Sequence, residues 1–247
     1  MCDSSKQCSS RPLFLTSLLA CILFPAFSFA EEAVDLGPSR LILGATAYYE
    51  SGRLEGEEQV ATQERDQSFD YRGANFLSTR IIYLRPFSER LLIGGGIDFM
   101  GSYQAMLLEE DGPADPPDLY EFGPKVDFFV VGEWRIDLTG DVDLGVGAQA
   151  GLVSLFPRGD LAEEIRDLQD SNVPVFSGPR PGWSAGAHVA GIYRIDDRIS
   201  LRGDLGAQWE SIFVFRTSRT VDGVAFRKNW TTGTLRTRLG VSMEVSF

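Results

Sequence analysis

The sequence predicts an all-β protein, an eight-stranded, antiparallel, up-and-down transmembrane β-barrel with short periplasmic turns and long extracellular loops. Three observations lead to this fold class. Apolar and polar residues alternate over long segments from residue 38 onward, the connections between these segments are alternately short and long, and aromatic residues gather at the segment ends. The 247-residue chain is long enough for one such domain once a signal segment is removed.

The alternation has a period of two residues, which is the pattern of a strand with one apolar and one polar face. Between residues 126 and 138, Val126, Phe128 and Val130 fall on one face, whereas Asp127 and Glu133 fall on the other. The whole chain gives eight strands, near 39–50, 74–85, 91–104, 121–137, 141–156, 182–195, 198–215 and 232–247. Their lengths reach the roughly 9–11 residues that a tilted strand needs to cross a bilayer.

The connections differ in length and composition. Tight turns that contain Pro, Gly or Asp occupy 86–90, 138–140 and 196–197. Long, polar connections occupy 51–73, 105–120, 157–181 and 216–231. Short turns at one end and long loops at the other are typical of membrane barrels, with the turns in the periplasm.

One of the long connections predicts a short helix over residues 160–170. Asp160 is expected to cap its N-terminus, with Glu163 three residues later, and Leu161, Ile165 and Leu168 form an apolar stripe. An ordinary loop helix is favoured over a gate at the barrel mouth.

Aromatic side chains of outward parity predict a girdle at each membrane interface. Four lie near the short turns and six near the long loops, in the order Tyr83, Trp134, Tyr193, Phe247 and then Tyr49, Tyr103, Phe156, Trp183, Phe213, Phe215. A soluble core would not sort its aromatics to the strand ends in this way.

The inward parity collects seven arginines and eight acids, which nearly balance although the formal net charge of the chain is −12. These residues are Arg40, Glu50, Arg80, Asp98, Asp127, Glu133, Arg135, Asp143, Arg194, Arg202, Asp204, Glu210, Arg236, Arg238 and Glu244. Charges removed from water must be paired, so we expect Arg–carboxylate bridges across the lumen. The interior of an eight-stranded barrel is about wide enough for side chains to fill, which favours a closed lumen over a channel.

The N-terminus predicts a cleaved secretory signal over residues 1–30, followed by a short periplasmic segment at 31–37 and the barrel domain at 38–247. Lys6 and Arg11 precede the apolar run 13–27, and Ser28 and Ala30 supply the small residues of a cleavage site. All three cysteines lie in this signal, so no disulfide is expected in the mature chain. Residues 18–21 also match a lipobox, which leaves lipidation of Cys21 as the alternative.

At this point the chain resembles the small eight-stranded outer-membrane proteins of the OmpA/OmpX-like group. The resemblance covers residues 38–247 as architecture, and the end of the chain adds to it. Val241, Met243, Val245 and Phe247 form the pattern of the C-terminal signal that such proteins present to the barrel-assembly machinery. The resemblance implies outer-membrane lipid, lipopolysaccharide and that machinery as partners.

No catalytic, cofactor-binding or metal site is predicted. His188 is the only histidine and has inward parity, so a satisfied lumen residue is favoured over a general base beside Glu210. With one histidine and no cysteine in the mature chain, a His/Cys metal site is excluded. The acids at 109–118 lack the EF-hand spacing, and the acidic net charge argues against a nucleic-acid partner.

We therefore expect a non-enzymatic, monomeric, integral outer-membrane barrel of a Gram-negative bacterium, with a salt-bridged lumen and a structural or surface-interaction role through its loops. The extracellular partner is not identified by the sequence. One alternative is a porin-like pore for small solutes or small apolar molecules. Another is a soluble periplasmic ligand-binding barrel, which would need its apolar face inside and its charges outside.

Overall fold

The computed structural model describes residues 37–102, 104–108, 119–221 and 223–247. The signal segment, Tyr103 and the acids at 109–118 lie outside this part of the chain. The described elements are β1 (Arg40–Val60), β2 (Gln63–Pro86), β3 (Leu91–Met100), β4 (Gln104–Leu108), β5 (Leu119–Glu121), β6 (Lys125–Thr139), β7 (Val142–Leu155), α2 (Gly159–Asp170), β8 (Arg180–Arg194), β9 (Ile199–Val221) and β10 (Val224–Ser246).

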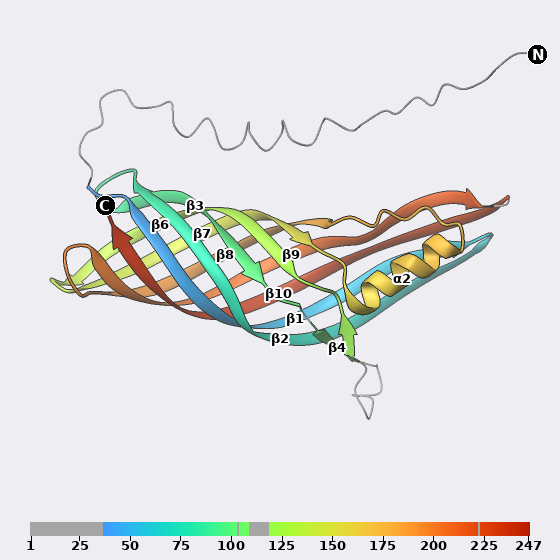
Figure 1. The fold of residues 1–247 in the computed structure, drawn as a ribbon, viewed down its shortest axis with the longest axis horizontal. Coiled ribbons are helices and arrows are strands. Elements are labelled where there is room, and N and C mark those ends of the chain that lie inside the picture. The colour runs from blue at the N-terminus through green and yellow to red at the C-terminus, as the bar shows by residue number, and fades with distance from the viewer. Residues whose placement is uncertain (1–36, 103, 109–118, 222) are drawn as a thin grey trace, which may run out of the picture. The chain divides into compact units, whose positions relative to one another are not determined.

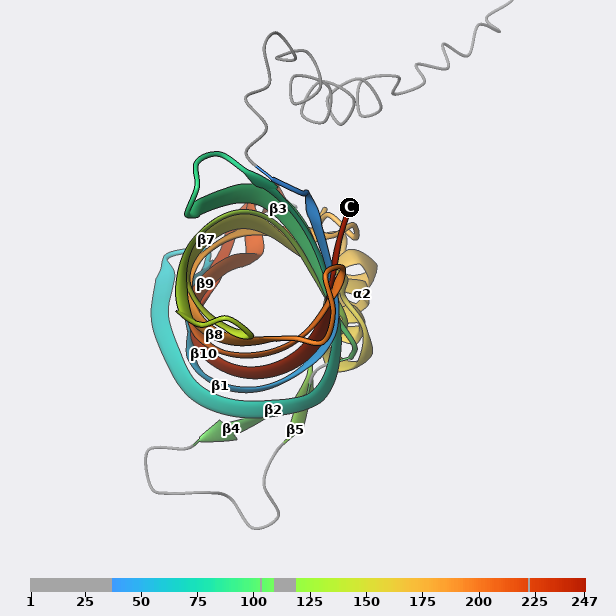
Figure 2. The same ribbon diagram turned by 90° about the vertical axis from the view of Figure 1, so that its left-hand side faces the viewer.

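Eight of the strands close into a ring. They follow the order β1-β10-β9-β8-β7-β6-β3-β2, and β2 pairs back with β1. Each pairing in the ring is antiparallel, and Figure 2 shows the closed ring end-on. The short strands β4 and β5 are not part of the ring: β4 pairs with β2, and β5 pairs with β4. The predicted eight-stranded barrel is confirmed.

The two ends of the barrel differ. The tight turns β2–β3, β6–β7 and β8–β9 lie at the end where the barrel domain starts and finishes (Figure 1). There the backbone of Ser39 and that of Phe247 exchange two hydrogen bonds of 2.9 and 3.0 Å. The last residue of the chain is thereby tied to the first strand.

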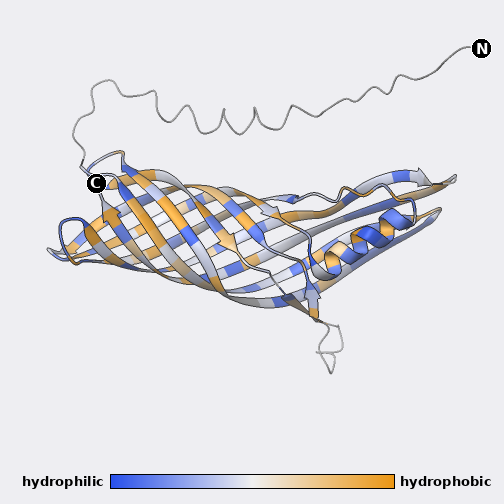
Figure 3. Cartoon of the chain, viewed as in Figure 1, coloured by the Kyte–Doolittle hydropathy of each residue, from blue (hydrophilic) through white to orange (hydrophobic). Residues whose placement is uncertain are grey.

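Every strand of the ring presents large apolar residues to the outside. Figure 3 shows many hydrophobic residues, in orange, along the barrel strands. One example from each strand is Leu43, Ile81, Ile97, Val130, Val146, Val189, Leu205 and Leu239. Charged residues of the same strands lie buried inside the ring, among them Glu50, Arg80 and Asp127. This is the arrangement of a barrel in lipid, and the reverse of what a soluble ligand-binding barrel requires. None of the helical segments that the structure describes is both long and apolar enough to span a bilayer.

The prediction that residues 51–73 and 216–231 form long loops is wrong in part. The strands β1 and β2 continue through the first range, and β9 and β10 continue through the second. The β1–β10 pairing runs without a break from Arg40↔Ser246 to Val60↔Phe226. We call the part of β1 after Glu50, together with the parts of β2, β9 and β10 that lie alongside it in the pairing, the sheet extension. It projects from the barrel in Figure 1. Outside the lipid a strand needs no apolar face, so the polar sequence there lacks the alternation that marks the barrel strands.

The helix α2 lies close to the predicted range of 160–170. Its N-cap residue is Arg158, and that side chain makes no capping bond, so the prediction of Asp160 as the cap is wrong. Asp160 instead accepts a hydrogen bond of 2.7 Å from the backbone N–H of Glu121. This hydrogen bond attaches the start of the helix to β5. Leu161 and Ile165 of the predicted stripe are buried.

Candidate functional site

The interior of the barrel holds a quartet of two acids and two bases. Lys125 Nζ lies 3.0 Å from Glu50 Oε1 and 3.0 Å from Glu210 Oε1. Arg236 donates its Nε to Glu50 over 2.6 Å and its Nη2 to Glu210. All four side chains are buried. Since β6 and β10 are four strands apart in either direction around the ring, the quartet crosses the full width of the lumen.

A second cluster crosses the lumen nearer the short turns. Arg135 bridges Glu133 over 2.6 Å and Glu244 over 2.7 Å, so it also joins β6 to β10. Arg202 of β9 donates to both oxygens of Glu133, over 3.1 and 2.6 Å. Arg40 adds a 2.6 Å bond to Glu244 from the rim. Two carboxylates are therefore each held by more than one guanidinium, which is a geometry that Arg provides better than Lys.

Between these clusters lies a layer of amides and carboxylates. Arg80 and Arg238 both donate to Gln149 Oε1, and the amide of Gln149 donates 3.1 Å to Gln208. Gln208 in turn donates 2.6 Å to Asp127. The layer links strands β2, β10, β7, β9 and β6 into one polar network.

The predicted lumen residues are distributed as follows. All of them are buried except Arg40, which is partly exposed, and Arg194, which is exposed at the short-turn end and bridges Asp143 over 2.6 Å. Asp98 lies beside Arg80 in the β2–β3 register, and Asp204 lies 3.8 Å from Arg238.

Sequence reasoning missed Lys125, Gln149 and Gln208 as members of the network. Lys125 shares the parity of Asp127 at the end of β6, which was the available signal. The two glutamines carry no charge, so a search for charged residues of inward parity passes over them.

His188 is buried, and its Nε2 lies 2.9 Å from Glu133 Oε2. It contacts the second cluster, whereas Glu210 belongs to the quartet with Lys125 and Arg236. The imidazole ring of His188 fits because residue 147 is glycine. A Cβ at this position would lie 2.4 Å from His188 Cε1. Among the described residues no group of His, Cys, Asp and Glu is arranged to hold a metal ion.

Little space remains inside the lumen. A cavity lined by Arg80, His188, Arg202, Asp204 and Arg238 has a volume of about 10 Å³. This is about the space that one water molecule needs. The side chains of the polar network thus fill this part of the barrel.

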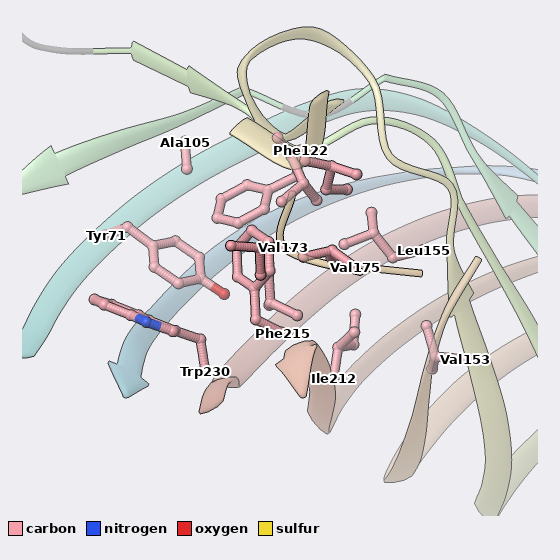
Figure 4. Packing of buried hydrophobic residues seen from close by; sticks show 13 residues of the cluster. Tyr71, Ala105, Phe122, Val153, Leu155, Val173, Val175, Ile212, Phe215 and Trp230 are labelled. Atoms are coloured by element: carbon pink, nitrogen blue, oxygen red, sulfur yellow. The ribbon is translucent and has the colours of Figure 1, made fainter. Parts of the chain in front are cut away.

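Above the quartet the interior becomes apolar. A cluster of buried residues lies at the base of the sheet extension and under α2, and we call it the mouth cluster (Figure 4). It consists of Tyr71, Ala105, Phe122, Val153, Leu155, Leu161, Ile165, Val173, Val175, Ile212, Val214, Phe215 and Trp230.

Phe215 corrects the predicted aromatic girdle. The other predicted members in the described chain, Tyr49, Tyr83, Trp134, Phe156, Trp183, Tyr193, Phe213 and Phe247, are exposed on the outside. Phe215 is only 4% exposed and lies inside the mouth cluster. The β9–β10 register skips Val214, since Trp230 pairs with Phe215 and Thr231 with Phe213. This bulge reverses the parity of β9 beyond residue 213, so counting by twos places Phe215 on the wrong face.

The helix α2 is attached to two strands through one carboxylate. Glu164 accepts a hydrogen bond from Lys228 of β10 and another, 2.9 Å long, from the Tyr120 hydroxyl of β5. Burial and the nearby Glu164 raise the pKa of Tyr120, so this hydroxyl stays protonated and donates. Lys228 also lies 4.8 Å from the centre of the Phe215 ring.

The outer faces of the sheet extension carry exposed ion pairs. Arg53 donates 2.6 Å to Asp70 on the neighbouring strand, and Arg227 lies 2.7 Å from Glu57. The hydrogen bond from Arg53 lowers the pKa of Asp70. Arg227 and Lys228 of the fourth long connection therefore pair with acids of this same chain.

No protein-family model and no curated protein matches the chain. Among solved structures it is similar to the outer membrane protein OprG of Pseudomonas aeruginosa, at 9% identity over 85% of this chain and 96% of that chain, with a TM-score of 0.48. It is also similar to the outer membrane protein AlkL, at 13% identity over 88% and 93%, with a TM-score of 0.43. Neisserial surface protein A gives 12% identity over 81% and 97%, with a TM-score of 0.37.

The TM-scores are all below 0.5, so the fold is assigned from the strand pairing described above. The closed ring of eight strands and its apolar outer face define a small outer-membrane type of β-barrel.

Proposed function

We propose that this chain is a non-enzymatic integral outer-membrane protein with a closed lumen, which acts through the part of its structure outside the membrane. The observation that carries the proposal is the pair of ion clusters that cross the lumen from β6 to β10. A solute would have to separate both clusters and the amide layer between them. Each separation exposes buried charges that have no other partner, which is costly in a narrow lumen.

The sheet extension is the part of the molecule best suited to a surface role. Ten residues of β1 lie beyond the quartet residue Glu50, which at a rise of about 3.3 Å per residue corresponds to roughly 30 Å of strand. The extension is held by continuous pairing of four strands and by the mouth cluster. It therefore offers a structured surface rather than a set of separate loops.

The proposed orientation follows from the two ends. The short turns and Phe247 face the periplasm, where Val241, Met243, Val245 and Phe247 address the assembly machinery, and a signal peptide at 1–30 precedes the barrel. The apolar belt contacts lipid in this proposal, and the exposed Arg216 and Arg219 are the cations that would contact lipopolysaccharide phosphates. A monomer suffices, because the ring closes within one chain.

Two measurements test the proposal together. The mature chain refolded in detergent should migrate faster on a gel before heating than after, and protease added to intact cells should cleave only at 51–73, 105–120, 157–181 or 216–231. The same preparation in a planar bilayer should give no reproducible single-channel steps. Steady unitary currents would refute the closed lumen, and recovery of the chain in the soluble periplasmic fraction would refute the location.

A second candidate is a passage for small apolar molecules, favoured by the mouth cluster at the outer end of the lumen. It requires the solute to leave the apolar region before it reaches the quartet. Uptake of a radiolabelled hydrocarbon by proteoliposomes would separate the candidates. Uptake above that of protein-free liposomes would support the passage, whereas equal rates would leave the closed barrel.

A further inference from the structure

Arg180, the first residue of β8, is a buried cation without a counter-ion in the described structure. It is 5% exposed, and its Nε and Nη2 have no hydrogen-bond partner among the described residues. No carboxylate of the described residues lies within ion-pairing distance of Arg180. By contrast, Arg135, Arg202 and Arg236 each contact at least one carboxylate.

The surroundings of Arg180 are apolar. Its guanidinium lies 5.7 Å from the centre of the Phe215 ring and 5.9 Å from that of Phe176. Its partner in the β7–β8 register is Leu155, which belongs to the mouth cluster. The acids of the quartet, Glu50 and Glu210, are held by Lys125 and Arg236. The cation thus faces aromatic and aliphatic groups with two donor atoms free.

We propose that Arg180 and the mouth cluster bind a small amphipathic carboxylate, with the carboxylate on the guanidinium and the hydrocarbon part among the apolar side chains. An unpaired buried charge is costly, and a ligand that brings the opposite charge removes that cost. The planar guanidinium matches a carboxylate through two parallel hydrogen bonds. Aliphatic and aromatic walls around a single polar anchor are typical of sites for such ligands.

The Arg180 site lies close to the surface. Phe176, whose ring centre is 5.9 Å from the Arg180 guanidinium, is itself 68% exposed and is not part of the mouth cluster. The next residue, Ser177, lines a hollow of about 160 Å³ beside α2, together with Pro157, Ala162, Ile165, Arg166 and Gln169. A cavity of roughly 150 Å³ accommodates a molecule the size of benzene. A short hydrocarbon chain therefore fits in this hollow.

A singly charged head group is favoured over a phosphate. Of the two cations that lie against the Phe215 ring, Lys228 is engaged by Glu164, whereas Arg180 has no carboxylate partner among the described residues. A phosphate carries close to two negative charges at neutral pH and would be left half paired. The inference extends the proposed function by naming a ligand class for the outer end of the barrel. It rests on the proposed function in one respect, namely that this end of the barrel faces the outside of the cell.

Isothermal titration calorimetry on the refolded mature chain tests the site, with hexanoate as the probe and hexanol and hexyl phosphate as comparisons. We expect hexanoate to bind more tightly than both. Arg180→Gln should weaken hexanoate binding at least about tenfold, the factor that corresponds to about 1.4 kcal/mol. Arg180→Lys should restore it only in part, and Arg65→Gln, at an exposed arginine of β2, should leave it unchanged. Retained heat-modifiability on a gel shows that each variant is folded.

Four results would overturn the inference as stated. One is that hexanoate binds no more tightly than hexanol, and another is that Arg180→Gln binds hexanoate as the unaltered chain does. The third concerns the acids Glu109, Glu110, Asp111, Asp115 and Asp118. If their joint replacement by amides increases hexanoate affinity about tenfold or more, one of them is the natural counter-ion, and the site is not for an external ligand. Tighter binding of hexyl phosphate than of hexanoate would replace the carboxylate by a phosphate head.

Discussion

Replacement of Arg236 by methionine gives the sharpest test of the lumen network. Arg236 is 1% exposed and donates to both acids of the quartet, with 2.6 Å between its Nε and Glu50 Oε1. Methionine fills much of the volume but leaves Glu50 and Glu210 with Lys125 alone, so the neutral quartet acquires a net charge of about −1. Removal of one partner from a buried ion pair costs about 3–5 kcal/mol. We expect Arg236→Met to lower the free energy of unfolding by this amount.

Urea titration of the refolded barrel, read by the fraction of the heat-modifiable form on a gel, measures the change. Arg227→Met is the matched control, because it removes an arginine from an exposed pair with Glu57, where about 0–1 kcal/mol is expected. The double variant Arg236→Met with Glu210→Gln should recover part of the loss, since Glu50 and Lys125 then form a neutral pair. A loss below about 1 kcal/mol for Arg236→Met would refute the view that the buried bridges hold the lumen together.

Three further predictions follow from the two ends of the molecule. Phe247→Ala should lower the amount of barrel in outer-membrane fractions, measured by immunoblot, and unchanged levels would contradict the assembly-signal role. NMR titration should place the pKa of Asp70 below the ordinary value of an aspartate, because Arg53 donates a hydrogen bond to its carboxylate. Since the folded value is lowered, this interaction stabilises the sheet extension at higher pH and is lost as the pH falls through the folded pKa. Arg53→Gln should restore the ordinary pKa. Lys228→Met should free α2 and speed protease cleavage within 157–181, whereas equal cleavage rates would show that Glu164 does not hold the helix.

The fold could be predicted from the sequence because lipid imposes one rule on every barrel strand. Each must turn apolar residues outward and keep polar ones inside, so parity alone separates Leu205 from Arg202 and Asp204. The rule ends where the lipid ends. Beyond residue 50 of β1 neither face has to present apolar residues to lipid, so the continuation of the strands cannot be distinguished from a loop by its hydrophobic pattern.

The partners inside the lumen could not be predicted in the same way. Whether Lys125 meets Glu50 or Asp98 depends on the stagger of strands on opposite sides of the ring, which no local pattern records. A single bulge has a similar effect, since skipping Val214 moves Phe215 from the lipid face into the mouth cluster. The balance of inward charges was readable, but the pairing required the structure.

The structure divides the stabilising interactions between two regions. Within the membrane, lipid contacts and the paired charges fix the barrel, and Arg135, Arg202 and Arg236 each contact a carboxylate there. Beyond it, the extension depends on strand pairing, the mouth cluster and the attachment of α2 by Glu164, and here Arg180 has no carboxylate partner among the described residues. A cation that is already paired with a carboxylate has little to offer an anionic ligand, whereas a buried cation without such a partner is the feature that an anionic ligand can exploit. Substitutions that alter recognition without unfolding the barrel are therefore expected in the outer region, around Arg180 and α2, rather than in the lumen.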